Sequence, residues 1–291
     1  MKPGSAKNIN ENSHEAGMWA TSICSAQNNI IRAYAGYLSL KRKGVADLSR
    51  TTINRGFVLD AGAGQGAYSI WYATAKKSFC KVISVDISFS ALRRLQKNRD
   101  ENDLTDAILP VCADMTALPF KHTRFVAAFS VDALGHVDNV DSALNELLRC
   151  VCPNAGIFLH SECNDYKSRW PDRMLIKTLG KDVVAEVDHH TGQMSSQELF
   201  KAYSRRFTVL SFVNPAGYLG WLIGYPEKYR EAFALSRHPI LSRIVGFFAA
   251  IKGMWGIGMV VRLKNALSNH LENFLGLTGG GSCFAHVKKP Q

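Results

Sequence analysis

A glycine-rich segment after an apolar run could bind a small ligand. Residues 58–66 read Val-Leu-Asp-Ala-Gly-Ala-Gly-Gln-Gly, with Gly62, Gly64 and Gly66 at alternate positions. Glycine lets the backbone approach a bound molecule closely, and open α/β sheets bind ligands at the carboxyl ends of their strands. The spacing is G-x-G-x-G, whereas a dinucleotide turn facing a pyrophosphate has G-x-G-x-x-G. Because Asp60 precedes the glycines, a cationic ligand suits this turn better than an anion.

Two more acids follow apolar runs further along the chain. The run 81–86 ends in Asp86, as a parallel strand does when its carboxylate accepts hydrogen bonds from a ribose diol. A third run, 107–112, leads into Asp114 and Met115. Three acids at successive strand ends indicate one ligand site along a single edge of a parallel sheet.

The turn and the three acids resemble the class I S-adenosylmethionine-dependent methyltransferases, whose first motif is commonly D/E-x-G-x-G-x-G. The resemblance covers residues 55–163, with a weaker part up to residue 213, and implies S-adenosylmethionine as cofactor. It also implies that Asp114 accepts a hydrogen bond from the adenine amino group while Met115 packs on the ring. The expected cofactor-binding residues are Asp60, Gly62, Gly64, Gly66, Asp86, Ile87, Asp114, Met115 and Ser130.

The order of elements predicts an α/β fold with a doubly wound, mostly parallel seven-stranded sheet and an antiparallel last strand. The fourth strand is expected at 125–132, and a helix and a turn at 152–156 precede the fifth. That turn reads Cys-Pro-Asn-Ala-Gly, where relatives often carry Lys-Pro-Gly-Gly. The sixth and seventh strands are expected at 206–212 and 283–290. The predicted organisation is a disordered N-terminus over 1–14, a cofactor-binding core with N-terminal cap helices over 15–213, a helical insertion over 214–280 and the final strand over 281–291.

Helices are predicted before the first strand and before the last. Residues 15–48 carry apolar side chains at helical spacing, and the basic segment Lys41–Gly44 is expected to end that helix. Such a helix either covers the cofactor or packs on the sheet. The insertion 214–280 is rich in large apolar side chains, but no run reaches the roughly 18 to 20 residues that span a bilayer. A lid over a hydrophobic substrate is our first interpretation of it, and a core or dimer face or an interfacial membrane contact are the alternatives.

Few residues are candidates for the chemical step. Methyl transfer from a sulfonium is an in-line displacement, so the protein must hold the acceptor close to the methyl carbon and exclude water. A general base is needed only when the acceptor carries a proton that must leave. The candidates are His136, Glu162, His189 and His190, and His160 also follows the fifth strand. Many relatives carry a histidine at the position of His136 whatever they methylate. The Asp188–His190 segment reads equally as a polar loop, and no metal is predicted because its spacing is not that of a zinc site.

Charge leaves the acceptor class open. Residues 201–291 hold twelve Lys and Arg residues against three Glu, so +9 of the formal net charge of +11 lies there. That excess keeps RNA or protein as alternative substrates. Against nucleic acid, the fourth strand is not followed by an Asn/Asp-Pro-Pro-Tyr/Phe segment, and no Pro-Cys dipeptide is present. We therefore favour a small hydrophobic or lipid-like acceptor. Peripheral membrane contact, a homodimer and a non-catalytic cofactor-binding subunit are the alternatives.

Cysteine usage and the first residues bear on the compartment. Seven cysteines without framework spacing fit a reduced protein better than a disulfide scaffold. The first dozen residues are polar and lack the apolar run of a secretory signal. We expect a cytoplasmic location, either free or peripheral to a membrane.

Overall fold

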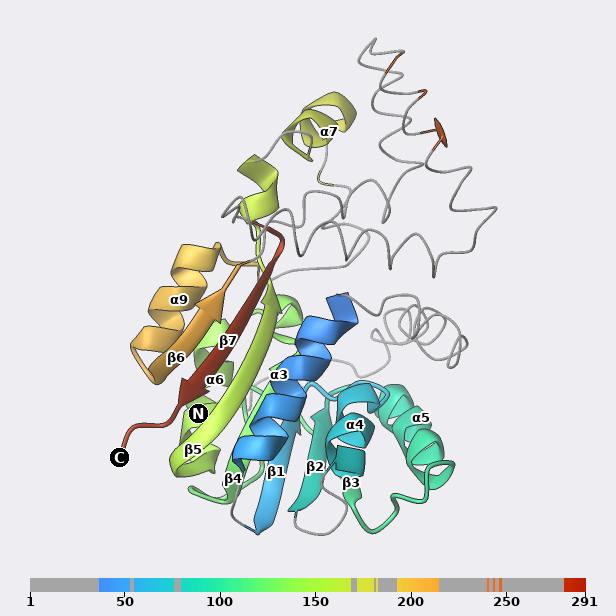
Figure 1. The fold of residues 1–291 in the computed structure, drawn as a ribbon, viewed down its shortest axis with the longest axis vertical. Coiled ribbons are helices and arrows are strands. Elements are labelled where there is room, and N and C mark those ends of the chain that lie inside the picture. The colour runs from blue at the N-terminus through green and yellow to red at the C-terminus, as the bar shows by residue number, and fades with distance from the viewer. Residues whose placement is uncertain are drawn as a thin grey trace, which may run out of the picture.

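The computed structural model describes residues 37–52, 55–75, 80–168, 172–180, 182, 193–214, 240, 243, 246–247 and 280–291. In this part of the chain a seven-stranded sheet carries helices on both faces (Figure 1). The strands are β1 (Gly56–Ala61), β2 (Cys80–Asp86), β3 (Ile108–Cys112), β4 (Phe125–Val131), β5 (Val151–Glu162), β6 (Thr208–Val213) and β7 (Ser282–Lys288). The helices are α3 (Tyr37–Thr51), α4 (Ala67–Ala75), α5 (Phe89–Asp100), α6 (Val140–Cys150), α7 (Asp172–Leu179) and α9 (Ser196–Ser204), with short 3-10 turns η1 (Leu134–His136) and η2 (Asp165–Ser168).

The strand order is β3-β2-β1-β4-β5-β7-β6, and it confirms the predicted doubly wound sheet. Strands β1 to β5 pair in parallel, whereas β7 runs antiparallel to both β5 and β6. The order reverses between β1 and β4, where successive crossovers leave the sheet in opposite directions. Ligands of open α/β sheets bind in the crevice at such a point, outside the carboxyl ends of the strands.

The central strands are apolar because helices cover them from both sides. On one face, Leu144 and Leu147 of α6 and Leu199 of α9 join a fully buried cluster. On the other face, Leu48 of α3 and Leu95 of α5 pack with α4 on the sheet. Strands buried on both faces read as continuous apolar runs, which is why β1, β2 and β4 were recognisable in the sequence.

Helix α3 corrects the expected helix end at Lys41–Gly44. The helix continues from residue 37 to residue 51, so Gly44 lies inside it. A Cβ atom on Gly44 would lie 2.1 Å from ring carbons of Phe158, a side chain of β5 that is almost fully buried. The glycine therefore permits close packing of α3, which lies along one face of the sheet (Figure 1), and does not terminate the helix.

Replacing Gly44 with alanine is expected to destabilise the fold. In an ordinary helix interior this change stabilises by roughly 0.5–1 kcal/mol, but here the added methyl overlaps the Phe158 ring. Overpacking of this kind typically costs about 1–3 kcal/mol. Urea denaturation of the Gly44→Ala protein measures the sign directly. The double variant Gly44→Ala/Phe158→Leu should recover part of the loss, and a net gain in stability for the single variant would contradict the close packing.

The fifth strand also differs from the expectation in detail. The predicted turn at 152–156 lies within β5, which follows α6 without a separate loop. The register against β4 shifts there, since Phe125 pairs with Val151 while Ala127 pairs with Gly156. Asn154 takes up a φ of +63°, a left-handed conformation that Asn tolerates better than most residues. The local turn chemistry was recognised, but it forms an irregularity inside the strand.

Several expectations fall on other parts of the chain. The N-terminal segment 1–14 lies outside the described residues, and so does most of the insertion 214–280, so its three interpretations stay predictions. Among the residues that the structure describes, none of the helices has the length and apolar character needed to cross a membrane.

Candidate active site

The glycine turn after β1 is open where a ligand could approach. Gly62 and Gly64 have φ values of +80° and +52°, in the left-handed region that favours glycine. A Cβ atom on Gly62 would lie 2.2 Å from the Cβ atom of Ala133, so the turn touches the end of β4. A Cβ atom on Gly64 would meet no atom within 4 Å. The turn is therefore packed on one side and exposes free backbone surface at Gly64.

Asp86 lies beside this turn at the end of β2. Its Oδ2 atom accepts a hydrogen bond from the Gly64 amide at 2.7 Å, and its Oδ1 atom accepts one from the Ser88 amide at 2.8 Å. Burial raises the pKa of Asp86, although these amides and the charge of His136 oppose that effect. A carboxylate has about four acceptor positions. With two amides bound, Asp86 can still accept hydrogen bonds from a ligand.

Asp60 lies deeper, inside the core of the domain. Its side chain is 2% exposed and accepts a hydrogen bond from Ser69 Oγ at 2.5 Å. Ser69 Oγ also lies 2.6 Å from Ser84 Oγ of the neighbouring strand. Burial raises the pKa of Asp60 to about 7, and the nearby carboxylate of Asp86 adds to this, while the Ser69 hydrogen bond opposes it. Asp60 thus joins β1, α4 and β2 beneath the turn.

The other expected cofactor residues lie along the same edge of the sheet. The amide of Ala113 donates to the Asp86 carbonyl at 3.1 Å, which brings Asp114 next to the β2 end. Asp114 is exposed and accepts a hydrogen bond from the Thr116 amide, whereas Met115 is buried and Ile87 is 52% exposed. Ser130 is fully buried, and its hydroxyl donates to the Ala61 carbonyl at 2.8 Å. A direct role of each in cofactor binding stays a prediction.

A second polar group, which we call the carboxyl cluster, lies at the ends of β4 and β5. It consists of Lys41, Asp132, His160 and Glu162. Lys41 Nζ lies 2.5 Å and 2.7 Å from the two carboxylate oxygens of Asp132, and His160 Nδ1 lies 2.9 Å from Asp132 Oδ1. One side-chain oxygen or nitrogen atom from each of Asp132, His160 and Glu162 lies within 4.8 Å of the other two. The Lys41 ammonium supplies positive charge beside the two carboxyl groups.

The cluster holds its members in different protonation states. Burial alone would raise the pKa of Asp132, but Lys41 and His160 hold it well below its usual range. Burial and the neighbouring Asp132 raise the pKa of Glu162 well above its usual range. Burial and Lys41 lower the pKa of His160 to about 4, although Asp132 acts in the opposite direction. At neutral pH Asp132 is therefore a carboxylate, His160 a neutral imidazole and Glu162 a protonated carboxyl group.

Three elements bring this cluster together. Strand β4 ends at Val131, and Asp132 takes up a φ of +59°, an uncommon conformation for a residue with a side chain. His160 and Glu162 lie at the end of β5, where His160 pairs with Val131 of β4. Lys41 comes from α3 and lies one helical turn before Gly44. The close approach of Gly44 to Phe158 of β5 brings this part of α3 near the sheet.

The residues predicted for catalysis lie in different parts of the structure, and their catalytic roles stay predictions. Glu162 lies in the cluster, whereas His136 lies in η1 and lowers the pKa of Asp86. His189 and His190 lie outside the described residues. Sequence reasoning missed Lys41 and did not select Asp132, although Asp132 follows a strand as directly as Asp86 does. Lys41 gave no signal, since only packing of α3 brings it to the sheet edge.

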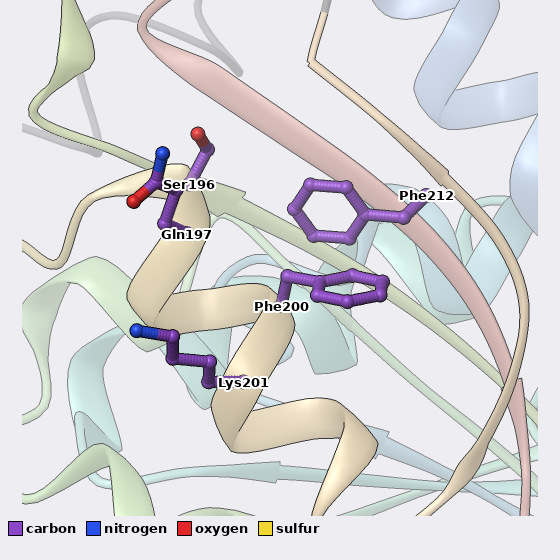
Figure 2. Close-up of a pocket in the computed structure, with 5 residues that line it drawn as sticks. All are labelled: Ser196, Gln197, Phe200, Lys201 and Phe212. Atoms are coloured by element: carbon purple, nitrogen blue, oxygen red, sulfur yellow. The ribbon is translucent and has the colours of Figure 1, made fainter.

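A shallow pocket elsewhere on the molecule is separate from these groups. It lies between α9 and β6 and has a volume of about 270 Å³ (Figure 2). Phe200 and Phe212 form its apolar side, with ring centroids 5.3 Å apart. Its lining residues are Ser196, Gln197, Phe200, Lys201 and Phe212. None of the groups at the ends of β1, β2 and β4 lines it.

Part of the chain is similar to known methyltransferases. Residues 59–159 match the sequence model of a methyltransferase domain. The sterol methyltransferase-like 3 of Botryococcus braunii is 31% identical over 103 residues, which cover 35% of this chain and 26% of that protein. The malonyl-(acyl-carrier protein) O-methyltransferase of Pseudescherichia vulneris is 28% identical over 138 residues, covering 46% and 51%. The chain thus spans about half or less of the length of these curated relatives.

Solved structures share the fold over a longer range. The geranyl diphosphate C-methyltransferase of Streptomyces coelicolor A3(2) superposes with a TM-score of 0.58 at 13% identity, covering 99% of this chain and all of that one. The cyclase SpnF superposes with a TM-score of 0.52 at 18% identity, covering 86% and 80%. The glycine turn lies within the segment that matches a methyltransferase domain, and the solved structures share the fold of this chain.

Proposed function

We propose that this protein transfers a methyl group from S-adenosylmethionine to a small hydrophobic acceptor. The observation that carries the cofactor part is the pairing of the Gly64 amide with the Asp86 carboxylate beside open backbone surface. This arrangement places a charged hydrogen-bond acceptor next to a turn without side chains. A ribose diol can bind the carboxylate while the rest of the cofactor crosses the turn.

The acceptor class is supported by the relatives and by the sequence of the insertion. One relative is named as a sterol methyltransferase-like protein, and a protein of the same fold as a geranyl diphosphate C-methyltransferase. A sterol is apolar, and geranyl diphosphate joins an apolar geranyl chain to an anionic diphosphate. The large apolar side chains of residues 214–280 would suit a lid over such a molecule. Fold alone does not decide the activity, because the cyclase SpnF shares it.

Replacing Asp86 with alanine is expected to weaken binding of S-adenosylhomocysteine by about 10²–10⁴-fold. Hydrogen bonds to a charged group contribute roughly 1.5–3 kcal/mol each, and a diol would lose two of them. The change also removes the acceptor that fixes the Gly64 amide. Isothermal titration calorimetry of the Asp86→Ala protein against S-adenosylhomocysteine measures this loss.

A matched control comes from the same region of the chain. Glu101 follows α5 and pairs with Lys97 at the surface, so Glu101→Gln should bind S-adenosylhomocysteine like the wild type. Unchanged affinity in Asp86→Ala would show that the cofactor site is assigned wrongly. Loss of affinity in both variants would show that removing any negative charge from this region weakens binding of S-adenosylhomocysteine.

Incubation of the protein with methyl-labelled S-adenosylmethionine and a cell extract tests the acceptor class. Label in the organic-soluble or small-molecule fraction supports the proposed function. Label in RNA or protein supports the alternative in which the basic residues of 201–291 dock a macromolecule. RNA binding would then weaken steeply with salt. Binding of S-adenosylhomocysteine without any labelled product would favour a non-catalytic cofactor-binding subunit.

A further inference from the structure

Asp132 is the most accessible side chain of the carboxyl cluster. The Asp132 side chain is 26% exposed, whereas the Oε2 atom of Glu162 is buried although the residue as a whole is partly exposed. Their partners lie behind them, because the Lys41 side chain is 10% exposed and His160 is fully buried. The pair is therefore reachable from outside through Asp132, while Lys41 and His160 are shielded from solvent.

Asp132 and Glu162 together carry one proton and one negative charge. Two carboxyl groups in one site resist ionising together, so one of them binds its proton more tightly. The groups of the described residues that act on the pair come from four elements. They are Lys41 of α3, Tyr68 of α4, His160 of β5 and Tyr203 of α9. Lys41 offsets the single negative charge, while burial and the neighbouring carboxyl groups raise the pKa of Tyr68, which keeps this phenol neutral.

The pair lies next to the cofactor turn. Ala133, which follows Asp132, is in contact with Gly62 of the turn. On the other side of Asp132, Ser130 donates a hydrogen bond to the carbonyl of Ala61, directly before Gly62. An acceptor held near a cofactor on this turn would therefore lie beside the two carboxyl groups.

We propose that the Asp132–Glu162 pair is the general base that takes a proton from an acceptor carrying an O–H or N–H group. This inference rests on the proposed function and narrows its substrate class. A bond forms between the acceptor heteroatom and the methyl carbon, and the carbon–sulfur bond breaks with its electron pair left on sulfur. The heteroatom–hydrogen bond also breaks, and its proton moves to the carboxyl pair, which becomes fully protonated.

The charges of the cluster suit this transfer. Before the reaction the sulfonium is positive, and the negative carboxyl pair is balanced by Lys41. Afterwards the sulfide is neutral and the carboxyl pair is neutral, while Lys41 keeps its charge. The net charge of the site is the same before and after, so no charge has to leave a buried environment. Lys41 and His160 are positioning residues that keep one carboxyl group ionised and ready to accept the proton.

Conservative variants of the full-length protein test the assignment. Asp132→Asn and Glu162→Gln are expected to bind S-adenosylhomocysteine within about twofold of the wild type. Their transfer of labelled methyl into the extract should fall by roughly 10²–10⁴-fold, the usual contribution of a general base. Glu101→Gln is the surface control and should keep wild-type transfer. Wild-type transfer rates in both cluster variants would overturn the proposal.

The pH profile separates a base from a structural role. Residual transfer by Asp132→Asn should rise with pH, because solvent then removes the proton. In Lys41→Met the acidic limb of the profile should move to higher pH, since the pair loses the charge that favours its ionised form. Profiles that keep the wild-type shape in both variants would overturn the proposal, even if the rates fall.

The product gives an independent decision. A labelled methyl ether or N-methyl group supports the proposal, whereas a carbon-bound methyl or a methyl ester of a carboxylate overturns it. Carbon-13 NMR of labelled carboxyl groups tests the pair without a methyl acceptor. One carboxyl group of the pair should titrate with a pKa far below the ordinary range, and the other with a pKa far above it. Two ordinary titrations would overturn the proposal. Absence of S-adenosylhomocysteine binding in the wild type would instead overturn the proposed function.

Discussion

The Asp60→Asn protein is expected to lose less stability than the wild type as the pH rises from 5 to 8. The Asp60 carboxyl is buried and has a folded-state pKa of about 7, against an ordinary value of 3.8. The unfolded chain releases this proton more readily than the folded protein does. Because one unit of pKa difference corresponds to about 1.4 kcal/mol, full ionisation of Asp60 costs the fold about 4 kcal/mol.

The direction follows from the raised pKa. The stabilising contribution of protonated Asp60 is fully present below pH 3.8, and it is lost progressively as the pH rises through 7. Asparagine cannot ionise, so this loss disappears. Between pH 5 and pH 8 the free energy of unfolding of the variant should rise relative to the wild type by about 3 kcal/mol.

Urea denaturation at pH 5, 6, 7 and 8 measures this difference. The change in the difference with pH is the relevant quantity, since asparagine also alters the hydrogen bond with Ser69 by a constant amount. Asp106→Asn, at an exposed position, is the matched control and should run parallel to the wild type. Parallel curves for Asp60→Asn would show that Asp60 is not the buried titrating group.

Replacing Lys41 with methionine is expected to lower the free energy of unfolding at pH 7 by about 3 kcal/mol. Removing one partner of a buried ion pair leaves the other charge uncompensated and typically costs about 3–5 kcal/mol. We expect the lower end of that range because the Asp132 side chain keeps 26% exposure. Methionine has a similar length and preserves the packing of α3.

The double variant Lys41→Met/Asp132→Asn isolates the electrostatic part of this loss. Removing both charges should cost less than removing Lys41 alone, because no buried charge then lacks a partner. Lys43→Met, at an exposed position two residues further along α3, should change stability little. If the double variant is less stable than Lys41→Met, packing rather than the ion pair accounts for the effect.

Acidification provides a second check on the same pair. The pKa of Asp132 is lowered in the folded protein, so its stabilising contribution is present above pH 3.8 and is lost as the pH falls below that value. The difference between Lys41→Met and the wild type should therefore shrink in acid. A difference that stays constant down to pH 3 would assign it to causes other than Asp132.

Most of the sheet could be predicted because its sequence signals are local. Strands β1, β2 and β4 are covered on both faces and read as apolar runs, and the acids and glycines at their ends are adjacent in the chain. The helix end at Gly44 was predicted wrongly because a glycine inside a helix resembles a stop when its packing partner is unknown. That partner, Phe158, lies more than a hundred residues away in the sequence.

The sequence by itself determined the class of fold, the order of elements and the position of the glycine turn. Each depends on the type of a residue and on its neighbours in the chain. Only the tertiary structure decided which ionisable side chains lie close enough to shift the pKa of one another. Asp132, His160 and Glu162 come from two strand ends, and Lys41 comes from a helix that precedes the whole sheet. The pKa of each depends on burial and on charges a few ångström away, and sequence spacing does not encode those distances.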